Sequence, residues 1–128
     1  MHILATDDEQ RALNVLMGSI KETVPKSKVH GFRNPHDALE FMKETKCEIA
    51  FLDIKMRGMS GIVLARKLKE IYPKVNIVFV TGYSEYANEA FDLHASGYVY
   101  RIMGALAIGS WSRIRMPSVI TIDKITAT

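Results

Sequence analysis

The sequence predicts an α/β fold, a doubly wound parallel sheet of five strands with helices packed on it. Short apolar runs alternate along the chain with segments in which apolar residues recur at helical spacing. Strands that alternate with helices pair in parallel through right-handed crossovers, which leaves few topologies. A chain of 128 residues, 48% hydrophobic and 24% charged, suits one globular domain with its own core.

The first part of the chain contains three predicted strands and two predicted helices. In order they are a strand at 2–6, a helix at 9–23, a strand at 28–32, a helix that begins at Pro35 and a strand at 47–52. Leu13, Leu16 and Ile20 recur at three- and four-residue intervals, which places them on one face of the first helix. Asn34 can cap the second helix, since Pro35 follows it at the first helical position.

The second part continues the alternation as far as Arg101. It predicts a loop at 54–61, a helix at 62–71, a strand at 75–80, a helix from Ser84 to about Ala95 and a short strand at 97–100. The run at 75–80 is nearly continuous and β-branched, which is typical of a parallel strand buried on both faces. After Arg101 no fifth helix is visible, because Gly104 and Gly109 interrupt the segment. Residues 119–122 instead favour a strand.

Carboxylates stand directly after two of the predicted strands. Asp7 and Asp8 follow the first strand, and Asp53 follows the third. In an open α/β sheet, ligands bind beyond the carboxyl ends of the strands, so these side chains are expected to share one pocket. Carboxylates that close repel one another, and a cation relieves the repulsion. Because Mg²⁺ prefers oxygen ligands, the pattern indicates Mg²⁺ and phosphate chemistry.

Charge and composition argue against several other classes of protein. Residues 1–100 carry 13 basic and 13 acidic side chains, so the net charge of +3 comes from residues 101–128. A neutral body argues against direct nucleic-acid binding. No apolar run approaches the roughly 20 residues that a membrane span requires, and no signal peptide is visible. One cysteine, Cys47, suits a reducing compartment, so we expect a cytoplasmic protein.

The positions at the predicted strand ends resemble the receiver domain of two-component response regulators, a flavodoxin-like fold. They are Asp7 and Asp8, Asp53, Thr81 with Gly82, and Gly97 with Tyr98. The loop at 53–61 is also similar to the family's segment after its phosphoacceptor. Residues 81–98, TGYSEYANEAFDLHASGY, are most similar to receivers joined to LytTR-type DNA-binding domains. The resemblance covers residues 1–101.

The resemblance implies a role for each of these residues. Asp53 would accept a phosphoryl group from a sensor histidine kinase. Asp8 would bind Mg²⁺ directly together with Asp53, Asp7 would assist through water, and the backbone carbonyl of Lys55 would complete the protein ligands. Thr81 would hydrogen-bond a phosphoryl oxygen. Tyr98 would be the aromatic switch that responds to Thr81.

Two positions depart from the family's pattern. Arg101 and Ile102 stand where the family has lysine and then proline, usually with a cis peptide bond. Arginine keeps the charge that pairs with the phosphoryl group, but its planar fork is not equivalent to an ammonium. Without proline a trans bond is expected. Arg57 replaces the family's proline after Met56.

Residues 102–128 match nothing in the receiver pattern. They are expected to replace the fifth helix with an atypical segment, either a vector-derived or out-of-frame tail or a natural variant. A receiver without that helix would leave the edge of the last strand open to another chain. A homodimer or an exchanged dimer through residues 102–128 is therefore a further expectation.

Three functions remain open from the sequence. The leading one is a phosphorylation-switched signalling receiver, not an enzyme in the ordinary sense, whose DNA-binding output domain lies outside this chain. The alternative is an interaction module of the same fold that works without phosphorylation, because the lysine and the fifth helix are lost. A Mg²⁺-dependent phosphohydrolase is the third, although no general acid or base is evident.

Overall fold

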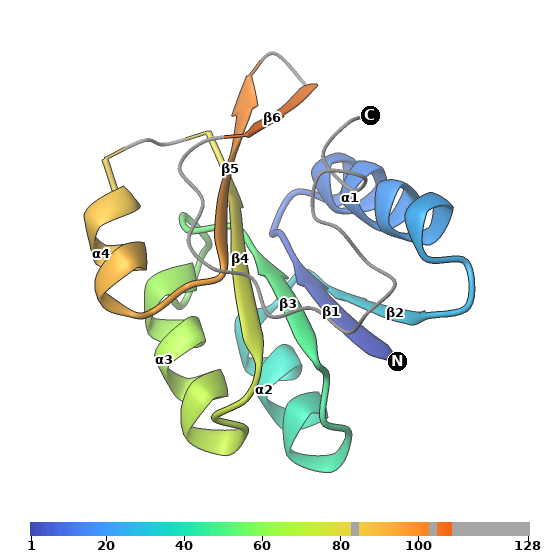
Figure 1. The fold of residues 1–128 in the computed structure, drawn as a ribbon, viewed down its shortest axis with the longest axis horizontal. Helices are drawn as coiled ribbons and strands as arrows, with labels where there is room; N and C mark the ends of the chain where they lie inside the picture. The colour runs from blue at the N-terminus through green and yellow to red at the C-terminus, as the bar shows by residue number, and fades with distance from the viewer. Residues whose placement is uncertain (83–84, 103–104, 109–128) are drawn as a thin grey trace.

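The computed structural model describes residues 1–82, 85–102 and 105–108. Within them, β1 (His2–Thr6), β2 (Lys28–Phe32), β3 (Ile49–Leu52), β4 (Asn76–Thr81), β5 (Gly97–Ile102) and β6 (Ala105–Ile108) form one sheet. The helices are α1 (Gln10–Thr23), α2 (Pro35–Glu44), α3 (Gly61–Ile71) and α4 (Ala87–Asp92). These elements alternate as the sequence predicts, up to β5 (Figure 1).

The strand order is β2-β1-β3-β4-β5-β6, and β1 to β5 are all parallel. The predicted sheet of five parallel strands is therefore confirmed. The connection reverses direction between β2 and β3, so that β1 and β3 lie side by side in the sheet. The crevice for a ligand is expected at such a switch point, beyond the carboxyl ends of the two strands.

A sixth strand, β6, corrects the expectation of an open edge on the last strand. It pairs antiparallel with β5, with Tyr100 opposite Ala107. The predicted strand at 97–100 is also two residues too short, because β5 continues through Arg101 to Ile102 in order to pair with β6. The predicted strand at 119–122 lies outside the described residues. The described residues contain no cis peptide bond, as expected for the step from Arg101 to Ile102.

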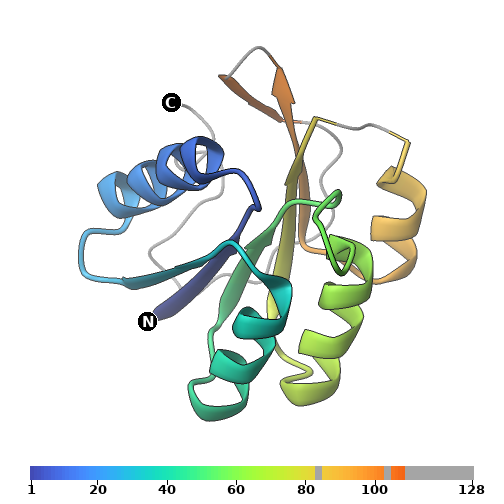
Figure 2. The ribbon, with the colours of Figure 1, turned by 180° about the vertical axis from the view of Figure 1, so that it is seen from behind.

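Helices cover the two faces of the sheet (Figures 1 and 2). The stripe of Leu13, Leu16 and Ile20 on α1 packs against one face in a cluster with Phe51 and Val78. On the other face, α2, α3 and α4 contribute to a second cluster, whose members include Leu39, Leu64, Ala90 and Phe79. The strands between the clusters are buried on both faces, as their continuous apolar runs predict.

Capping residues fix where the helices begin. The side chain of Asn34 accepts a hydrogen bond from the backbone N–H of His36, and Pro35 is the first residue of α2, so this predicted cap is confirmed. Ser60 caps α3 in the same way, because its Oγ accepts from the N–H of Val63 at 3.2 Å.

The fourth helix is shorter than predicted. It ends at Asp92 rather than near Ala95, because His94 adopts a left-handed backbone conformation with φ of 56°. Ser84, the predicted cap, lies outside the described residues. Among the described residues, no helix is a candidate for a membrane span.

Candidate functional site

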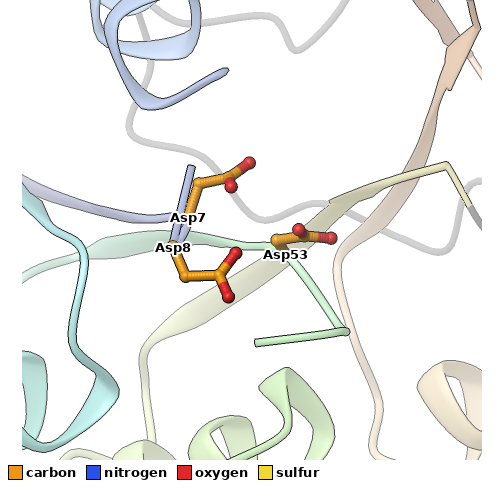
Figure 3. Close-up of side chains that lie close together, drawn as sticks. All are labelled: Asp7, Asp8 and Asp53. Carbon is orange, nitrogen blue, oxygen red and sulfur yellow. The ribbon is translucent and has the colours of Figure 1, made fainter. Parts of the chain in front are cut away.

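The carboxyl ends of β1, β2 and β3 converge and deliver the acidic residues to one place. Thr6 pairs with Leu52 in the sheet, and the N–H of Asp53 donates to the carbonyl of Thr6 at 3.2 Å. On the other side, the N–H of Asp7 donates to the carbonyl of Phe32 at 3.2 Å. The residues that follow β1 and β3 are therefore held by the sheet itself. Figure 3 shows Asp7, Asp8 and Asp53 together at this edge.

The three carboxylates form a compact acidic cluster. Each offers an oxygen, and these oxygens all lie within 4.8 Å of one another. Asp7 is 2% exposed, while the Asp8 side chain is 26% exposed, so the cluster opens to solvent on the Asp8 side. The structure thus brings together the three acids that the sequence predicts to share a pocket. Among the described residues, this is the only group of three or more acidic, histidine or cysteine side chains so placed.

The donor set fits a small oxygen-seeking cation. The three carboxylate oxygens lie within 4.8 Å of one another, close enough for a single small cation to be shared among them. Carboxylates are the protein ligands this ion prefers, and it keeps several waters, which the exposed Asp8 side permits. The residues that could hold it are Asp7, Asp8 and Asp53.

Backbone N–H groups orient each carboxylate. Oδ1 of Asp7 accepts from the N–H of Glu9 at 3.0 Å, and Oδ1 of Asp53 accepts from the N–H of Ile54 at 2.8 Å. Oδ2 of Asp8 accepts from the N–H of Arg57 at 3.1 Å. Hydrogen bonds from N–H groups to charged oxygens are strong, so the acids are preorganised before any ligand arrives.

The loop between β3 and α3 is folded tightly beside Asp53. The N–H of Gly61 donates to the carbonyl of Ile54 at 2.7 Å. A Cβ at Gly61 would overlap the carbonyl oxygen of Asp53, so only glycine fits there. Gly58 has φ of 86°, a conformation that side chains rarely adopt, and it turns the chain back toward α3. Both glycines are therefore required by the path of the loop.

A cavity of about 510 Å³ opens beside Asp8. Its lining residues include Lys55, Arg57, Arg66, Tyr86 and Glu89. The ammonium of Lys55 lies 6.0 Å from the centre of the Tyr86 ring, at the outer limit of a cation–π contact. Three basic side chains therefore line the cavity next to Asp8, and their charge favours an incoming anionic phosphoryl group.

The remaining predicted residues lie on β4 and β5. Thr81 ends β4 and is fully buried. Tyr98 is 2% exposed and packs on Phe79, with ring centres 6.2 Å apart. Arg101 lies in β5, where its backbone pairs with Leu106 of β6.

Two basic residues that contact Asp8 escaped prediction. Besides its N–H, Arg57 places its Nε 3.7 Å from Oδ2 of Asp8. Arg33 donates from Nε and Nη2 to the backbone carbonyl of Asp8, each at 3.2 Å. A signal for Arg33 was present, because it directly follows β2, whose carboxyl end adjoins β1. No periodicity or motif points to Arg57.

Cys47 lies outside the acidic cluster. It is fully buried, and burial, with a smaller contribution from Glu48, raises the pKa of its thiol to about 11. A thiol with that pKa is protonated at neutral pH and is a poor nucleophile.

Comparison with known proteins identifies the family. The family model described as response regulator receiver domain matches residues 3–105. The chain is 33% identical over 101 residues to the transcriptional regulatory protein YpdB of Escherichia coli K12, covering 79% of this chain and 41% of YpdB. The chain therefore spans about two fifths of the length of this curated relative.

Solved structures agree with the family model. The response regulatory domain of MrkE from Klebsiella pneumoniae matches with a TM-score of 0.73 and 31% identity, over 79% of this chain and 83% of that one. The response regulator TrrA from Thermotoga maritima, solved in complex with Mg²⁺ and beryllium fluoride, matches with a TM-score of 0.71 and 25% identity, over 80% and 87%. The sensory transduction protein LytT of Bacillus subtilis is 31% identical over 99 residues, which cover 77% of this chain and 41% of LytT, and this agrees with the predicted resemblance to receivers of LytTR-type regulators. The chain belongs to the response regulator receiver domain family of two-component signalling.

Proposed function

We propose that Asp53 of this receiver accepts a phosphoryl group from a sensor histidine kinase with the help of Mg²⁺. The observation that carries the proposal is the acidic cluster, with its three oxygens within 4.8 Å at the carboxyl ends of β1 and β3. Asp8 and Asp53 would hold the ion directly, Asp7 would assist through water, and the backbone carbonyl of Lys55 would complete the protein ligands. TrrA, a related receiver, was solved with Mg²⁺ and beryllium fluoride.

The chemistry is a transfer between two nucleophiles. An oxygen of the Asp53 carboxylate forms a bond to phosphorus while the bond from phosphorus to the donor breaks, and the donor keeps that electron pair. Bound Mg²⁺ supplies charge neutralisation for the phosphoryl oxygens. The protein's own contribution is positioning, because the N–H of Ile54 holds Oδ1 of Asp53 at 2.8 Å.

The response is assigned to three residues beyond the cluster. The Thr81 hydroxyl hydrogen-bonds the phosphoryl group, Tyr98 follows its movement, and Arg101 supplies the cation that the family's lysine supplies. Burial of Thr81 and Tyr98 favours this role, since a small displacement of one packed residue must be accommodated by its neighbours. We further propose that residues 1–101 are the receiver and that residues 102–128, of which 105–108 pair with β5, stand in place of its fifth helix.

The partners follow from the family. Receivers of two-component systems interact with sensor histidine kinases, and the family is a regulatory domain of signalling rather than a classical enzyme. We place the output in a transcription-regulating DNA-binding domain outside this chain, since YpdB is a transcriptional regulator and is longer. A cytoplasmic location and self-association through residues 102–128 complete the proposal.

The test is mass spectrometry after incubation with a small phosphodonor such as acetyl phosphate. The wild-type protein should gain one phosphoryl group in the presence of Mg²⁺, and both Asp53→Asn and Asp8→Ala should gain none. Asp37→Asn, an exposed carboxylate in α2, is the matched control and should be modified like wild type. A phosphorylated Asp53→Asn protein would contradict the assignment.

A second function, an interaction module that works without phosphorylation, is favoured by Arg101 and Ile102 at the positions of the family's lysine and proline. The substitution Arg101→Lys distinguishes the phosphorylated receiver from the interaction module that works without phosphorylation. A rise in phosphorylation or in beryllium fluoride affinity would mean that the geometry of this cation limits the site. No modification of either protein would favour the interaction module.

A further inference from the structure

Arg57 makes two contacts with a single atom of the acidic cluster. Its backbone N–H donates to Oδ2 of Asp8 at 3.1 Å, and its Nε lies 3.7 Å from the same oxygen. The Arg57 side chain is otherwise 91% exposed, whereas that of Asp8 is 26% exposed. The guanidinium thus lies beside the most accessible oxygen contact of Asp8 while remaining in solvent itself.

The fold of the loop places Arg57 there. Gly58, the next residue, turns the chain with φ of 86°, and the bond from Gly61 to Ile54 closes the loop. The N–H contact therefore belongs to the backbone path and does not depend on the side chain. The guanidinium contact does, and at 3.7 Å across an exposed surface it can be broken at little cost.

We propose that Arg57 is a built-in counter-ion of the metal site, which neutralises Asp8 in the metal-free protein and competes with the divalent cation for it. The inference rests on the proposed function, since the competition requires that Mg²⁺ bind at Asp8. The backbone N–H orients the carboxylate in both states, because an oxygen with two lone pairs can accept it and still bind a metal. The guanidinium of Arg57 sets the affinity of the site for the divalent cation.

The physical reason is that the guanidinium faces a cluster of three carboxylates, which becomes less negative when a divalent cation binds. Without metal, three carboxylates within 4.8 Å repel one another, and the guanidinium lowers that repulsion. With metal, the guanidinium is a like charge beside the cation. Arg57 therefore stabilises the metal-free protein and weakens metal binding.

The first experiment is a calorimetric titration with MgCl₂ at low and high ionic strength. Arg57→Ala should bind Mg²⁺ roughly two- to fivefold more tightly than wild type at low ionic strength, the range expected for an exposed ion pair. High salt should shrink this gain by screening. Arg57→Lys keeps the charge and should stay near wild type. Arg66→Ala, which removes an equal charge from the lining of the same cavity, should change the affinity less than Arg57→Ala.

The second experiment is thermal unfolding with and without saturating Mg²⁺. Arg57→Ala should have a lower Tm than wild type without metal, and the difference should close when Mg²⁺ is added. A residue that only supports the loop would lower Tm equally under both conditions.

The outcomes separate this inference from the proposed function. If wild type binds Mg²⁺ and Arg57→Ala binds it with the same affinity, or more weakly, the counter-ion role is wrong and the metal site stands. If neither protein binds Mg²⁺ and Asp53 is not modified, both fail. Binding by Arg57→Ala where wild type shows none would support the inference in its strongest form.

Discussion

The two ends of the sheet carry polar side chains that are arranged in opposite ways. At the amino end, groups of complementary character meet: the N–H of His2 donates to Oε2 of Glu48 at 2.8 Å, and Oγ of Ser96 donates to Oδ1 of Asn76 at 2.9 Å. At the carboxyl end, three like charges gather within 4.8 Å. At the amino end the polar groups are paired by hydrogen bonds within the chain. At the carboxyl end the carboxylates gather negative charge that an external cation can neutralise.

The difference shows how a parallel sheet separates stability from function. The strands β1 to β5 all point the same way. At one end of these strands lie the residues that begin them, and at the other end lie the residues that follow them. Substitutions at the amino end should change stability alone, and substitutions at the carboxyl end should also change ligand binding.

The largest effect is expected for Gly61→Ala at the carboxyl end. The added Cβ overlaps backbone atoms of Asp53, which cannot move aside as a flexible side chain can. We expect a loss of about 3 kcal/mol in the free energy of unfolding, measured by urea denaturation. Gly18→Ala is the control, since nothing lies within 4 Å of a Cβ there, in the exposed middle of α1, and it should stabilise by about 0.5–1 kcal/mol. Equal changes in the free energy of unfolding for both variants would contradict the claim that the loop between β3 and α3 requires glycine at position 61.

Addition of Mg²⁺ should produce the next largest change in the free energy of unfolding, and this change should depend only on residues at the carboxyl end of the sheet. A concentration ten times Kd should raise the free energy of unfolding by about 1.4 kcal/mol. Asp8→Ala should abolish the increase, whereas Ser96→Ala at the amino end should preserve it. Calorimetric scans with and without the ion measure both. An increase that survives in Asp8→Ala would place the ion elsewhere.

Ser96→Ala itself should cost about 1 kcal/mol, because it removes the hydrogen bond to Asn76 at a buried position. Phosphorylation by acetyl phosphate should be unchanged. Slower phosphorylation, after correction for the folded fraction, would mean that the two ends of the sheet are coupled.

The smallest effect concerns His30, in the middle of the outer strand β2. Its ring lies against those of His2 and Phe41, and partial burial, followed by the charges of His2 and Lys28, lowers the pKa of its imidazole. The unfolded chain then binds a proton more readily, so stability should fall as pH drops below about 6.5. Solvent screens the partly exposed ring, so the change should stay below about 1 kcal/mol.

Unfolding of wild type and His30→Gln between pH 7.5 and 5.5 measures this dependence, where pH 6.5 is about the midpoint for a free imidazole. The two curves should converge as pH falls. A His30→Gln curve that runs parallel to that of wild type would rule out a linked proton at this ring.

Most of the fold was predictable because the signals are local. Each of β1 to β5 is an apolar run bounded by turn residues, and Asn34 with Pro35 marks a helix start through side-chain chemistry alone. β6 was missed because pairing at the edge of β5 depends on contacts between two strands and not on either sequence. The end of α4 was missed because a histidine, rather than a glycine, takes the left-handed position.

The site residues also fall into those that could be predicted from the sequence and those that could not. Asp7, Asp8 and Asp53 were predictable, since topology alone brings the ends of β1 and β3 together. The contacts of Arg57 were not, because they depend on the path of an irregular loop that carries no period. The resemblance to the family did not help there, since Arg57 is a departure from its pattern.

The burial of Cys47 gives the protein an internal probe of how often its core opens to solvent. The chain has one cysteine, which is fully buried in the cluster that α2, α3 and α4 share with the sheet, and burial raises the pKa of its thiol to about 11. A thiol reagent can reach it only when the surrounding helices separate, so the labelling rate reports how often the domain opens. Because no second thiol competes, that rate can be followed on the unmodified chain, with and without metal or phosphoryl donor.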